Sequence, residues 1–487
     1  MTRQIRLLGI GLMVCFVVLF IQLNRLTIFK ADELNANPNN TRAILRDFSQ
    51  PRGTVTTADG VVLARSVPSN DRFEYQREFP EAELFAHVSG FFSFTLGSSG
   101  VEKTYNDELA GRTLDLSFQD LSDLFVDKDR VGSLTLTVRA DLQRIAAEQL
   151  GDREGSVVAI DPRTGELLAL YSFPTYDPNL LADHDTAQAT QVQTLLDASP
   201  DKPRLARTYQ DRFFPGSTFK VVTATASLES GNVTVDEPTY PVTNEYVAPG
   251  TTRPLRNFEG ASCGGTLFTI LRNSCNTAFA QMGVEEAGPD EMINTSEAFG
   301  FNQDVPIDLT APATSVFPTD FDQNLPALAQ SSIGQNDVSA TPLQMAMVAA
   351  AVANDDGDVM VPHVLHDVRD TDGNIVDTYD PEVWTNAMSP GTAQIMREAM
   401  IGVVESGTAT RLAVPGMIVG GKTGTAQLGT PDPKSHAWII GWGGRPNEEP
   451  SIAVAVIVEG QPGASEQTGG RVAAPIAQAI IAAYLAG

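Results

Sequence analysis

The sequence carries little positive charge. Its 487 residues include 60 aspartates and glutamates but only 33 lysines and arginines, which gives a formal net charge of −27. A protein that binds nucleic acid or an anionic membrane surface through a basic face needs the opposite balance, because both of those surfaces are negative. The composition therefore argues against nucleic acid as a partner and is typical of an acidic, solvated surface.

Histidine is scarce, with five residues in the whole chain. His363 and His366 have a spacing that is found in metal sites, but no cluster of cysteine, glutamate or aspartate supports a third ligand. We therefore expect no metal and no other cofactor.

Cysteine is limited to three residues. Cys15 lies in an N-terminal apolar segment and follows Val14, where a lipoprotein cleavage site would need a small residue. Cys263 and Cys275 can pair as a disulfide if this part of the chain lies outside the cytoplasm. They can equally be two unpaired small residues of the core. The sequence leaves both possibilities open.

One apolar run is long enough to span a membrane. The chain is apolar from Leu7 to Leu23 apart from Gln22, and this is just enough to cross a bilayer. Arg3 and Arg6 precede the run and favour a cytoplasmic N-terminus. The alternative is a cleavable signal peptide, but no small-x-small site follows. We expect a cytoplasmic tail over 1–6, an uncleaved anchor over 7–23, and an extracytoplasmic remainder held at the cell membrane.

The region 24–151 has few long helical patterns. Residues 52–64 read as two strands around the Asp59-Gly60 turn, which predicts a hairpin. A further strand over Leu134–Val138 precedes a helix that ends at Gly151. No constellation of titratable residues is present, so we expect a mostly β spacer or interaction domain.

The region 152–487 combines strands at both ends with helices between them. Strands are predicted over 155–162, 167–171, 418–427, 437–442 and 452–458, and helices over 266–283, 342–353, 392–404 and 472–485. This order predicts an α+β domain in which helices back an antiparallel sheet.

Ser217 stands three residues before Lys220, at the start of an apolar run that ends before Gly231. One turn of helix places the Ser217 hydroxyl and the Lys220 amine on the same face. A serine hydroxyl becomes a good nucleophile when a base takes its proton, and a buried lysine with a lowered pKa can be that base. Taken alone this spacing is a weak signal, since it is common on solvated helix faces.

Two further motifs strengthen the indication that Ser217 is a nucleophile. The motif Ser274-Cys275-Asn276 offers a hydroxyl and a carboxamide that can point into one site. The motif Lys422-Thr423-Gly424-Thr425 leaves an apolar strand, and Gly424 leaves room for a ligand against the backbone. Ser274 could instead cap a helix, and Lys422 could protect a sheet edge. The three motifs in this order are typical of penicillin-binding proteins and serine β-lactamases.

The chain resembles the class B penicillin-binding proteins, most closely the penicillin-binding protein A type of actinobacteria. Outside the three motifs the likeness rests on Arg52-Gly53, Gly100-Val101-Glu102, Asp161-Pro162 and Ile333-Gly334-Gln335. Family members often have Asp-Arg where this chain has Thr56-Thr57, a departure in the N-terminal domain and not in the chemistry. The resemblance implies a pedestal, or dimerisation-type, domain over 24–151 and a transpeptidase domain over 152–487, with helices on both faces of its sheet.

The resemblance also implies the reaction. Ser217 attacks the carbonyl of the penultimate D-alanine of a peptidoglycan stem peptide that ends in D-Ala-D-Ala, and Lys220 takes the hydroxyl proton. Ser274 relays a proton to the departing amine, and Asn276 holds the substrate amide and Lys220. A second stem peptide then attacks the acyl-enzyme and forms the cross-link, while a β-lactam leaves Ser217 acylated.

The third motif receives the substrate's carboxylate in this scheme. Lys422 keeps the site electropositive, and the hydroxyls of Thr423 and Thr425 bind the carboxylate. The backbone N–H groups of Ser217 and Thr425 form the oxyanion hole. The family context further implies a membrane glycosyltransferase of the SEDS type as partner, and a role in division.

Other functions remain open. A serine β-lactamase or a D,D-carboxypeptidase uses water in place of the second peptide, and would turn over a β-lactam rapidly. A β-lactam sensor or scaffold would use binding alone, although sensors usually have several membrane spans.

Overall fold

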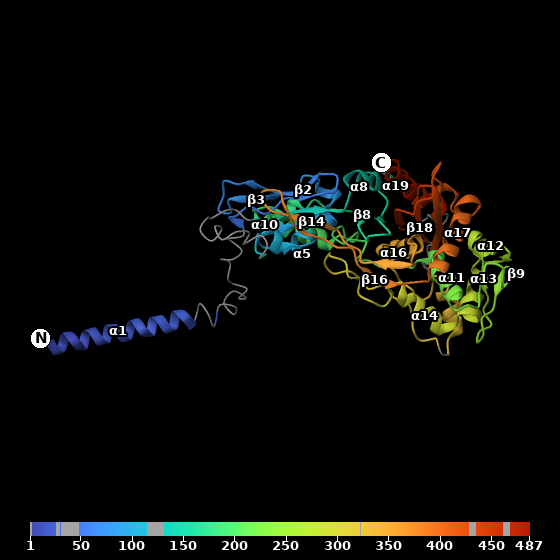
Figure 1. Cartoon of the computed structure of the whole chain (residues 1–487), viewed down its shortest axis with the longest axis horizontal. Coiled ribbons are helices and arrows are strands. Elements are labelled where there is room, and N and C mark those ends of the chain that lie inside the picture. The colour runs from blue at the N-terminus through green and yellow to red at the C-terminus, as the bar shows by residue number, and fades with distance from the viewer. Residues whose placement is uncertain are drawn as a thin grey trace.

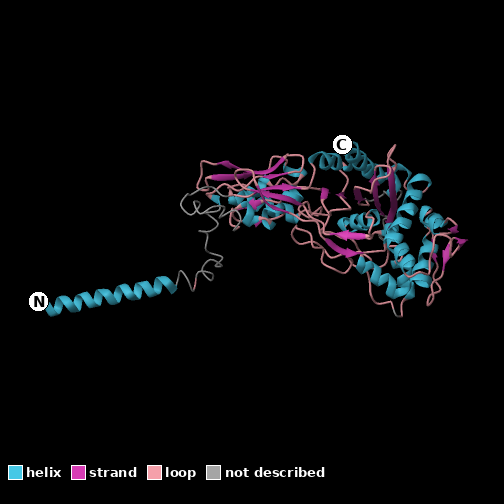
Figure 2. Ribbon diagram, viewed as in Figure 1, coloured by secondary structure: helices cyan, strands magenta, loops and turns pink. Residues whose placement is uncertain are grey.

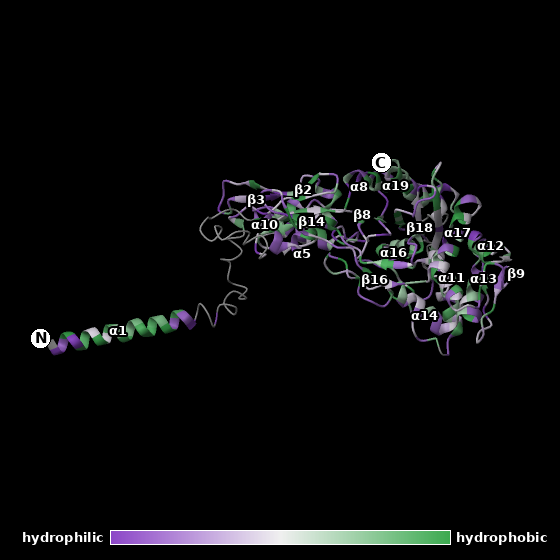
Figure 3. Cartoon of the chain, in the orientation of Figure 1, coloured by the Kyte–Doolittle hydropathy of each residue, from purple (hydrophilic) through white to green (hydrophobic). Residues whose placement is uncertain are grey.

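The structure is a computed structural model and describes residues 2–25, 30, 48–113, 131–321, 323–427, 435–460 and 468–487. The helix α1 (Thr2–Asn24) covers the predicted span. It is long and apolar enough to cross a membrane, and its apolar window is not buried by the rest of the chain. Figure 3 shows α1 as mostly hydrophobic along its middle, apart from the body of the molecule.

An N-terminal sheet of six strands has the order β15-β14-β6-β1-β2-β3. Its strands are β1 (Val55–Thr56), β2 (Val62–Pro68), β3 (Tyr75–Glu78), β6 (Ser133–Leu136), β14 (Leu365–Arg369) and β15 (Ile375–Thr378). The predicted hairpin at Asp59-Gly60 is confirmed, because β1 and β2 pair antiparallel. The strands β14 and β15 come from far along the chain, so the second predicted region also contributes to this sheet.

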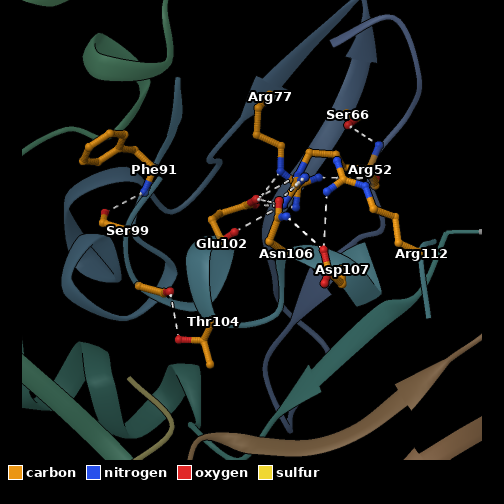
Figure 4. A network of polar contacts seen from close by, with 11 residues as sticks. Arg52, Ser66, Arg77, Phe91, Ser99, Glu102, Thr104, Asn106, Asp107 and Arg112 are labelled. Carbon is orange, nitrogen blue, oxygen red and sulfur yellow. Dashed lines mark hydrogen bonds and ion pairs between the residues drawn. The ribbon is translucent and has the colours of Figure 1, made fainter. Parts of the chain in front are cut away.

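A buried ion-pair network ties the entry of this domain to its short helices (Figure 4). Arg52 Nε donates to Glu102 Oε2 at 3.0 Å, and Arg77 Nε donates to Glu102 Oε1 at 2.6 Å. Glu102 lies in α5 (Val101–Thr104), and Asn106 of α6 (Asn106–Leu109) accepts from Arg52 at 3.0 Å. All three charged side chains are buried, so the Glu102 carboxylate offsets the desolvation cost of both arginines, which in turn offset its own.

The second sheet has five antiparallel strands in the order β17-β18-β19-β7-β8. They are β17 (Ile418–Gln427), β18 (Ser435–Gly444), β19 (Ile452–Val458), β7 (Gly155–Ile160) and β8 (Leu167–Phe173). Every residue of β18, β19 and β7 is buried, which explains their continuous small and apolar sequences. The predicted strands are confirmed, and β17 lies at the edge of the sheet.

Helices cover both faces of this sheet (Figures 1 and 2). The buried helix α16 (Pro342–Ala353) packs on β7, β18 and β19, with α17 (Pro390–Ser406) against β17. The other face carries α19 (Ala474–Ala486) and α8 (Ala140–Leu150). The helix α16 begins where predicted, because Thr341 caps it by accepting from Gln344 N and Pro342 follows the cap.

Asp308 ties strand β14 to the short N-terminal helices. Its carboxylate accepts from the Tyr105 hydroxyl at 2.7 Å and from the backbone N–H groups of Val364 and Leu365 at 2.8 and 2.9 Å. The carboxylate therefore holds β14 against the short N-terminal helices. The other elements outside the site described below are η2 (Ala82–Leu84), α4 (Ala86–Ser89), β4 (Phe92–Ser93), β5 (Gly97–Ser98), α9 (Asn179–Ala182), α10 (Thr186–Ala198), β9 (Tyr240–Thr243), β10 (Glu245–Tyr246), β11 (Leu255–Arg256), η5 (Phe258–Gly260), β12 (Cys263–Gly265), η6 (Met282–Ala287), α14 (Gly288–Ala298), α15 (Leu325–Ser331), β13 (Asp358–Met360), β16 (Val383–Asn386) and α18 (Gly469–Val472).

Candidate active site

Ser217 lies in a 3₁₀ turn, η4 (Gly216–Phe219), which leads directly into α11 (Lys220–Glu229). The sequence predicted one helix with Ser217 and Lys220 on the same side. The tighter turn keeps that relation, because side chains three residues apart eclipse each other in a 3₁₀ helix. Ser217 is half-buried, whereas Lys220 is completely buried. The hydroxyl is thus open to a ligand while the amine is shielded from water.

Two glycines allow the chain to pack tightly around this turn. Gly216 N donates to Gly334 O at 3.0 Å, and a Cβ at Gly334 would stand 2.2 Å from Gly216 O. On the other side, a Cβ at Gly424 would stand 2.9 Å from Pro215 O. The edge strand β17 and the turn at Gly334 therefore fix the backbone of the serine. Sequence reasoning gave Gly334 no role beyond its place in a family motif.

Ser274 lies in a sharp break between two helices. The pattern over 266–283 predicted continuous helix, but α12 (Leu267–Arg272) ends before Ser274 and α13 (Asn276–Gln281) begins after it. Ser274 has a φ of 57°, a left-handed conformation that L-residues other than glycine rarely adopt. This break turns the Ser274 and Asn276 side chains toward Lys220.

The Lys220 amine donates to three oxygens of this loop. It lies 2.7 Å from Ser274 O, 3.3 Å from Ser274 Oγ and 2.6 Å from Asn276 Oδ1. Asn276 is held in turn, because its Nδ2 donates to Arg256 O at 3.2 Å. Burial lowers the pKa of Lys220 well below its ordinary value, and the nearby charge of Lys422 lowers it further. This lysine can therefore be neutral where an ordinary lysine is charged.

The Lys422 amine reaches the same hydroxyl from the edge strand. It donates to Ser274 Oγ at 2.8 Å and to Thr423 O at 2.8 Å. Burial lowers the pKa of Lys422 to about 7. The Ser274 hydroxyl consequently lies between two amines and can pass a proton between groups near it. The three motifs predicted from the sequence do meet at one place.

The threonines of β17 lie beside these lysines. Thr423 is buried and its hydroxyl lies 2.6 Å from that of Thr408, whereas Thr425 is half-buried. Sequence reasoning missed Thr408, because a single threonine in a loop after a helix carries no pattern. It also missed Arg256, which acts through its backbone carbonyl and so leaves no trace in residue type.

A disulfide joins Cys263 of β12 to Cys275, whose side chain is buried at the start of α13. The pairing was one of two possibilities that the sequence left open. Because Cys275 stands between Ser274 and Asn276, the bond attaches the catalytic loop to the neighbouring two-stranded sheet of β9 and β12.

Within the described ranges, no group of three or more histidines, cysteines, aspartates or glutamates is placed to hold a metal ion. The His363 ring stacks on Tyr379 at 3.8 Å between centroids, and His366 Nδ1 lies 3.2 Å from Glu166 Oε1. What the arrangement offers is a serine, two amines of lowered pKa and a row of hydroxyls. These groups suit nucleophilic acyl transfer.

Comparison with known proteins gives two domain matches. The penicillin binding protein transpeptidase domain matches residues 155–482, and the penicillin binding protein A dimerisation domain matches residues 52–134. The chain is 37% identical to the peptidoglycan D,D-transpeptidase PbpA of Mycolicibacterium smegmatis, over all of this chain and 99% of that protein. It is 36% identical to the PbpA of Mycobacterium tuberculosis over the full length of both.

Solved structures of a relative also resemble the structure of this chain. Penicillin-binding protein A from M. tuberculosis as a ceftriaxone acyl-enzyme complex superposes with a TM-score of 0.83 at 34% identity, over 90% of this chain and 99% of that one. The penicillin G acyl-enzyme complex of the same protein gives a TM-score of 0.81 at 35% identity, over 90% of this chain and 100% of that one.

Proposed function

Because the chain belongs to the penicillin-binding protein family and is a class B peptidoglycan D,D-transpeptidase, we propose that it cross-links stem peptides through an acyl-enzyme on Ser217. The observation that carries this assignment is the Lys220 amine, buried three residues from Ser217 and bonded to both Ser274 and Asn276. A neutral amine there can accept the proton of Ser217.

Acylation uses the three motifs together. Ser217 Oγ bonds to the carbonyl carbon of the penultimate D-alanine as its proton passes to Lys220. The backbone N–H groups of Ser217 and Thr425 stabilise the oxyanion, and losing one such donor typically costs about 2.7–4 kcal/mol. The bond to the terminal D-alanine then breaks, and its nitrogen receives a proton through Ser274. Free D-alanine and a peptidyl ester on Ser217 are the products.

The second half-reaction transfers the peptide. The amine of a neighbouring stem peptide attacks the ester carbonyl, gives up a proton through the same groups, and restores the Ser217 hydroxyl. The Thr423 and Thr425 hydroxyls bind the terminal carboxylate of the donor peptide, with Lys422 adding positive charge. A β-lactam binds in the place of D-Ala-D-Ala, and its opened ring stays on Ser217 as the ester.

Labelling with a fluorescent penicillin tests the nucleophile. Ser217→Ala should abolish covalent labelling, and Ser230→Ala is the matched control at the other end of α11, expected to label as the wild type does. Labelling that persists in Ser217→Ala would refute the assignment. The release rate separates the reactions: a transpeptidase keeps the acyl group for long times, whereas rapid hydrolysis would indicate a β-lactamase.

We also propose that α1 anchors the chain with its N-terminus in the cytoplasm and its catalytic domain outside. The apolar length of α1 and the arginines before the predicted span support this topology. A SEDS-type glycosyltransferase is the proposed partner, reached through the anchor and the pedestal, and cell division is the proposed setting. A tagged copy should concentrate at division septa and co-purify with that polymerase; even distribution along the cell wall would contradict the division role.

A further inference from the structure

Thr408 is the first residue beyond the C-cap of α17, and its position is tightly fixed. The helix ends at Ser406, and the next residue, Gly407, runs so close to α12 that a Cβ there would stand 2.6 Å from Arg272 O. From the other side, a Cβ at Gly470 would stand 2.4 Å from Thr408 O. The backbone on both sides of Thr408 therefore leaves it little freedom.

The Thr408 side chain reaches from this position to the edge strand. Its Oγ1 lies 2.6 Å from Thr423 Oγ1, which is a short hydrogen bond between two hydroxyls. Thr408 is exposed, whereas Thr423 is only 7% exposed. The bond therefore joins an open residue at the rim of the site to a buried one within it.

The direction of this hydrogen bond matters for the chemistry. A hydroxyl has one proton to donate and can accept at its oxygen, whereas a carboxylate only accepts. Thr423 can donate to a carboxylate only if it does not spend its proton on Thr408. The two hydroxyls satisfy both demands when Thr408 donates to Thr423 and Thr423 donates to the ligand.

We propose that Thr408 is a positioning residue of the carboxylate subsite: its hydroxyl donates to Thr423 Oγ1 and so directs the Thr423 proton toward the carboxylate of the stem peptide or of a β-lactam. This inference rests on the proposed role of Thr423. It adds a residue from the loop between α17 and η7 (Thr410–Leu412) to a subsite that the sequence motifs place on β17 alone.

Two substrates that differ only in the carboxylate test the proposal. Penicillin G and its methyl ester acylate Ser217 through the same β-lactam carbonyl, and the ester lacks the negative charge that Thr423 would bind. In Thr408→Val the acylation rate with penicillin G should fall about ten- to a hundredfold, the size expected for a hydrogen bond to a charged group. The rate with the methyl ester should stay close to that of the wild type.

Two further variants complete the design. Thr408→Ser keeps the hydroxyl and should restore the preference for penicillin G over its ester. Thr410→Val removes an exposed hydroxyl two residues further along, at the start of η7, and should change neither rate. An equal loss with both substrates in Thr408→Val would show a merely structural role and overturn the proposal, as would no loss with either.

The same assay distinguishes a failure of the proposed role of Thr408 from a failure of the proposed function. If wild-type protein is acylated at Ser217 and Thr408→Val behaves like wild type, the role of Thr408 fails while the proposed function stands. If wild-type protein is not acylated at Ser217, both fail together.

Discussion

At the scale of single residues, the site is built on two buried lysines that share one hydroxyl. Ser274 Oγ lies 3.3 Å from Lys220 Nζ and 2.8 Å from Lys422 Nζ. Two positive charges in so small and dry a space repel each other, so the protonation of one opposes the protonation of the other. Lys220 is the lysine three residues from the nucleophile, and its lowered pKa keeps the amine neutral and so able to accept a proton.

The pH dependence of acylation should report this coupling. Lys220 accepts a proton only when its amine is neutral, so the rate should fall as the pH drops below its pKa. Removing the charge of Lys422 takes away one of the two causes that lower the pKa of Lys220. In Lys422→Gln the acid limb of the acylation profile should therefore move to higher pH.

The measurement is the rate of acylation by a fluorescent penicillin as a function of pH, in the wild type and in Lys422→Gln. Lys202→Gln, a change of charge at an exposed surface residue, should leave the profile in place. An acid limb of Lys422→Gln that stays where it is, or moves to lower pH, would contradict the proposed coupling.

At the scale of elements, the strands and helices were predictable but the breaks that shape the site were not. The period of apolar residues gave α16 and the five strands of the second sheet, because these elements are buried along their length. The same periodicity of apolar residues predicted a continuous helix through Ser274, but in the structure the helix breaks there. The break depends on contacts from Lys220 and Cys263, which are distant in sequence and invisible to a local pattern.

The disulfide should hold this broken segment in place. It closes a loop with a sequence separation of 12, for which the chain-entropy model gives about 3 kcal/mol. The double change Cys263→Ala and Cys275→Ala should lower the free energy of unfolding by about 2–4 kcal/mol. It should also slow acylation, because Ser274 and Asn276 lose their attachment to the two-stranded sheet of β9 and β12.

Urea unfolding and the rate of penicillin acylation are the two readouts for this change. Cys15→Ala removes the third cysteine, which lies exposed in α1, and should alter neither value. Unchanged stability in the double variant would show that packing alone holds the loop.

Gly334→Ala tests the packing that supports the nucleophile. Gly334 has a φ of +70°, and a Cβ would stand 2.2 Å from Gly216 O, so the turn that carries Ser217 must move. We expect the acylation rate to fall at least about tenfold, since small displacements of reacting groups are costly. The protein should also lose about 1–3 kcal/mol of stability from backbone strain.

Gly231→Ala is the matched comparison for Gly334→Ala. Gly231 follows the C-cap of α11 with a φ of +75°, but nothing lies within 4 Å of its added Cβ. Gly231→Ala should therefore lower the free energy of unfolding through backbone strain but leave the acylation rate unchanged. Equal acylation rates in the two variants would argue that the close approach at Gly334 does not position Ser217.

At the scale of the whole molecule, the N-terminal sheet takes strands from two distant parts of the chain, and the sequence did not reveal this. The hairpin at Asp59-Gly60 was predictable because its signals are local. The addition of β14 and β15 to the same sheet was not, because it depends on pairings such as Leu134 with Val368. The sequence of a short strand of mixed polarity does not indicate which strand it will pair with.

The buried carboxylate of Glu102 should be the main electrostatic support of the N-terminal domain. Glu102→Gln leaves Arg52 and Arg77 buried without a counter-charge, and breaking such a network typically costs about 3–5 kcal/mol. The exposed pair of Arg65 and Glu78 offers the control, since Glu78→Gln should cost less than about 1 kcal/mol. Urea unfolding of both variants measures the difference, and similar losses would contradict a special role for the buried network.

The composition of the N-terminal sheet also sets an order of events during synthesis. The ribosome makes β1, β2, β3 and β6 early, but β14, which covers the outer edge of β6, is made only after residue 364. At about 5–20 residues per second the unfinished sheet waits tens of seconds for this strand. Throughout that interval β6 presents unpaired backbone groups, the kind of edge on which chains aggregate. The N-terminal sheet can therefore be completed only after most of the catalytic half has been made.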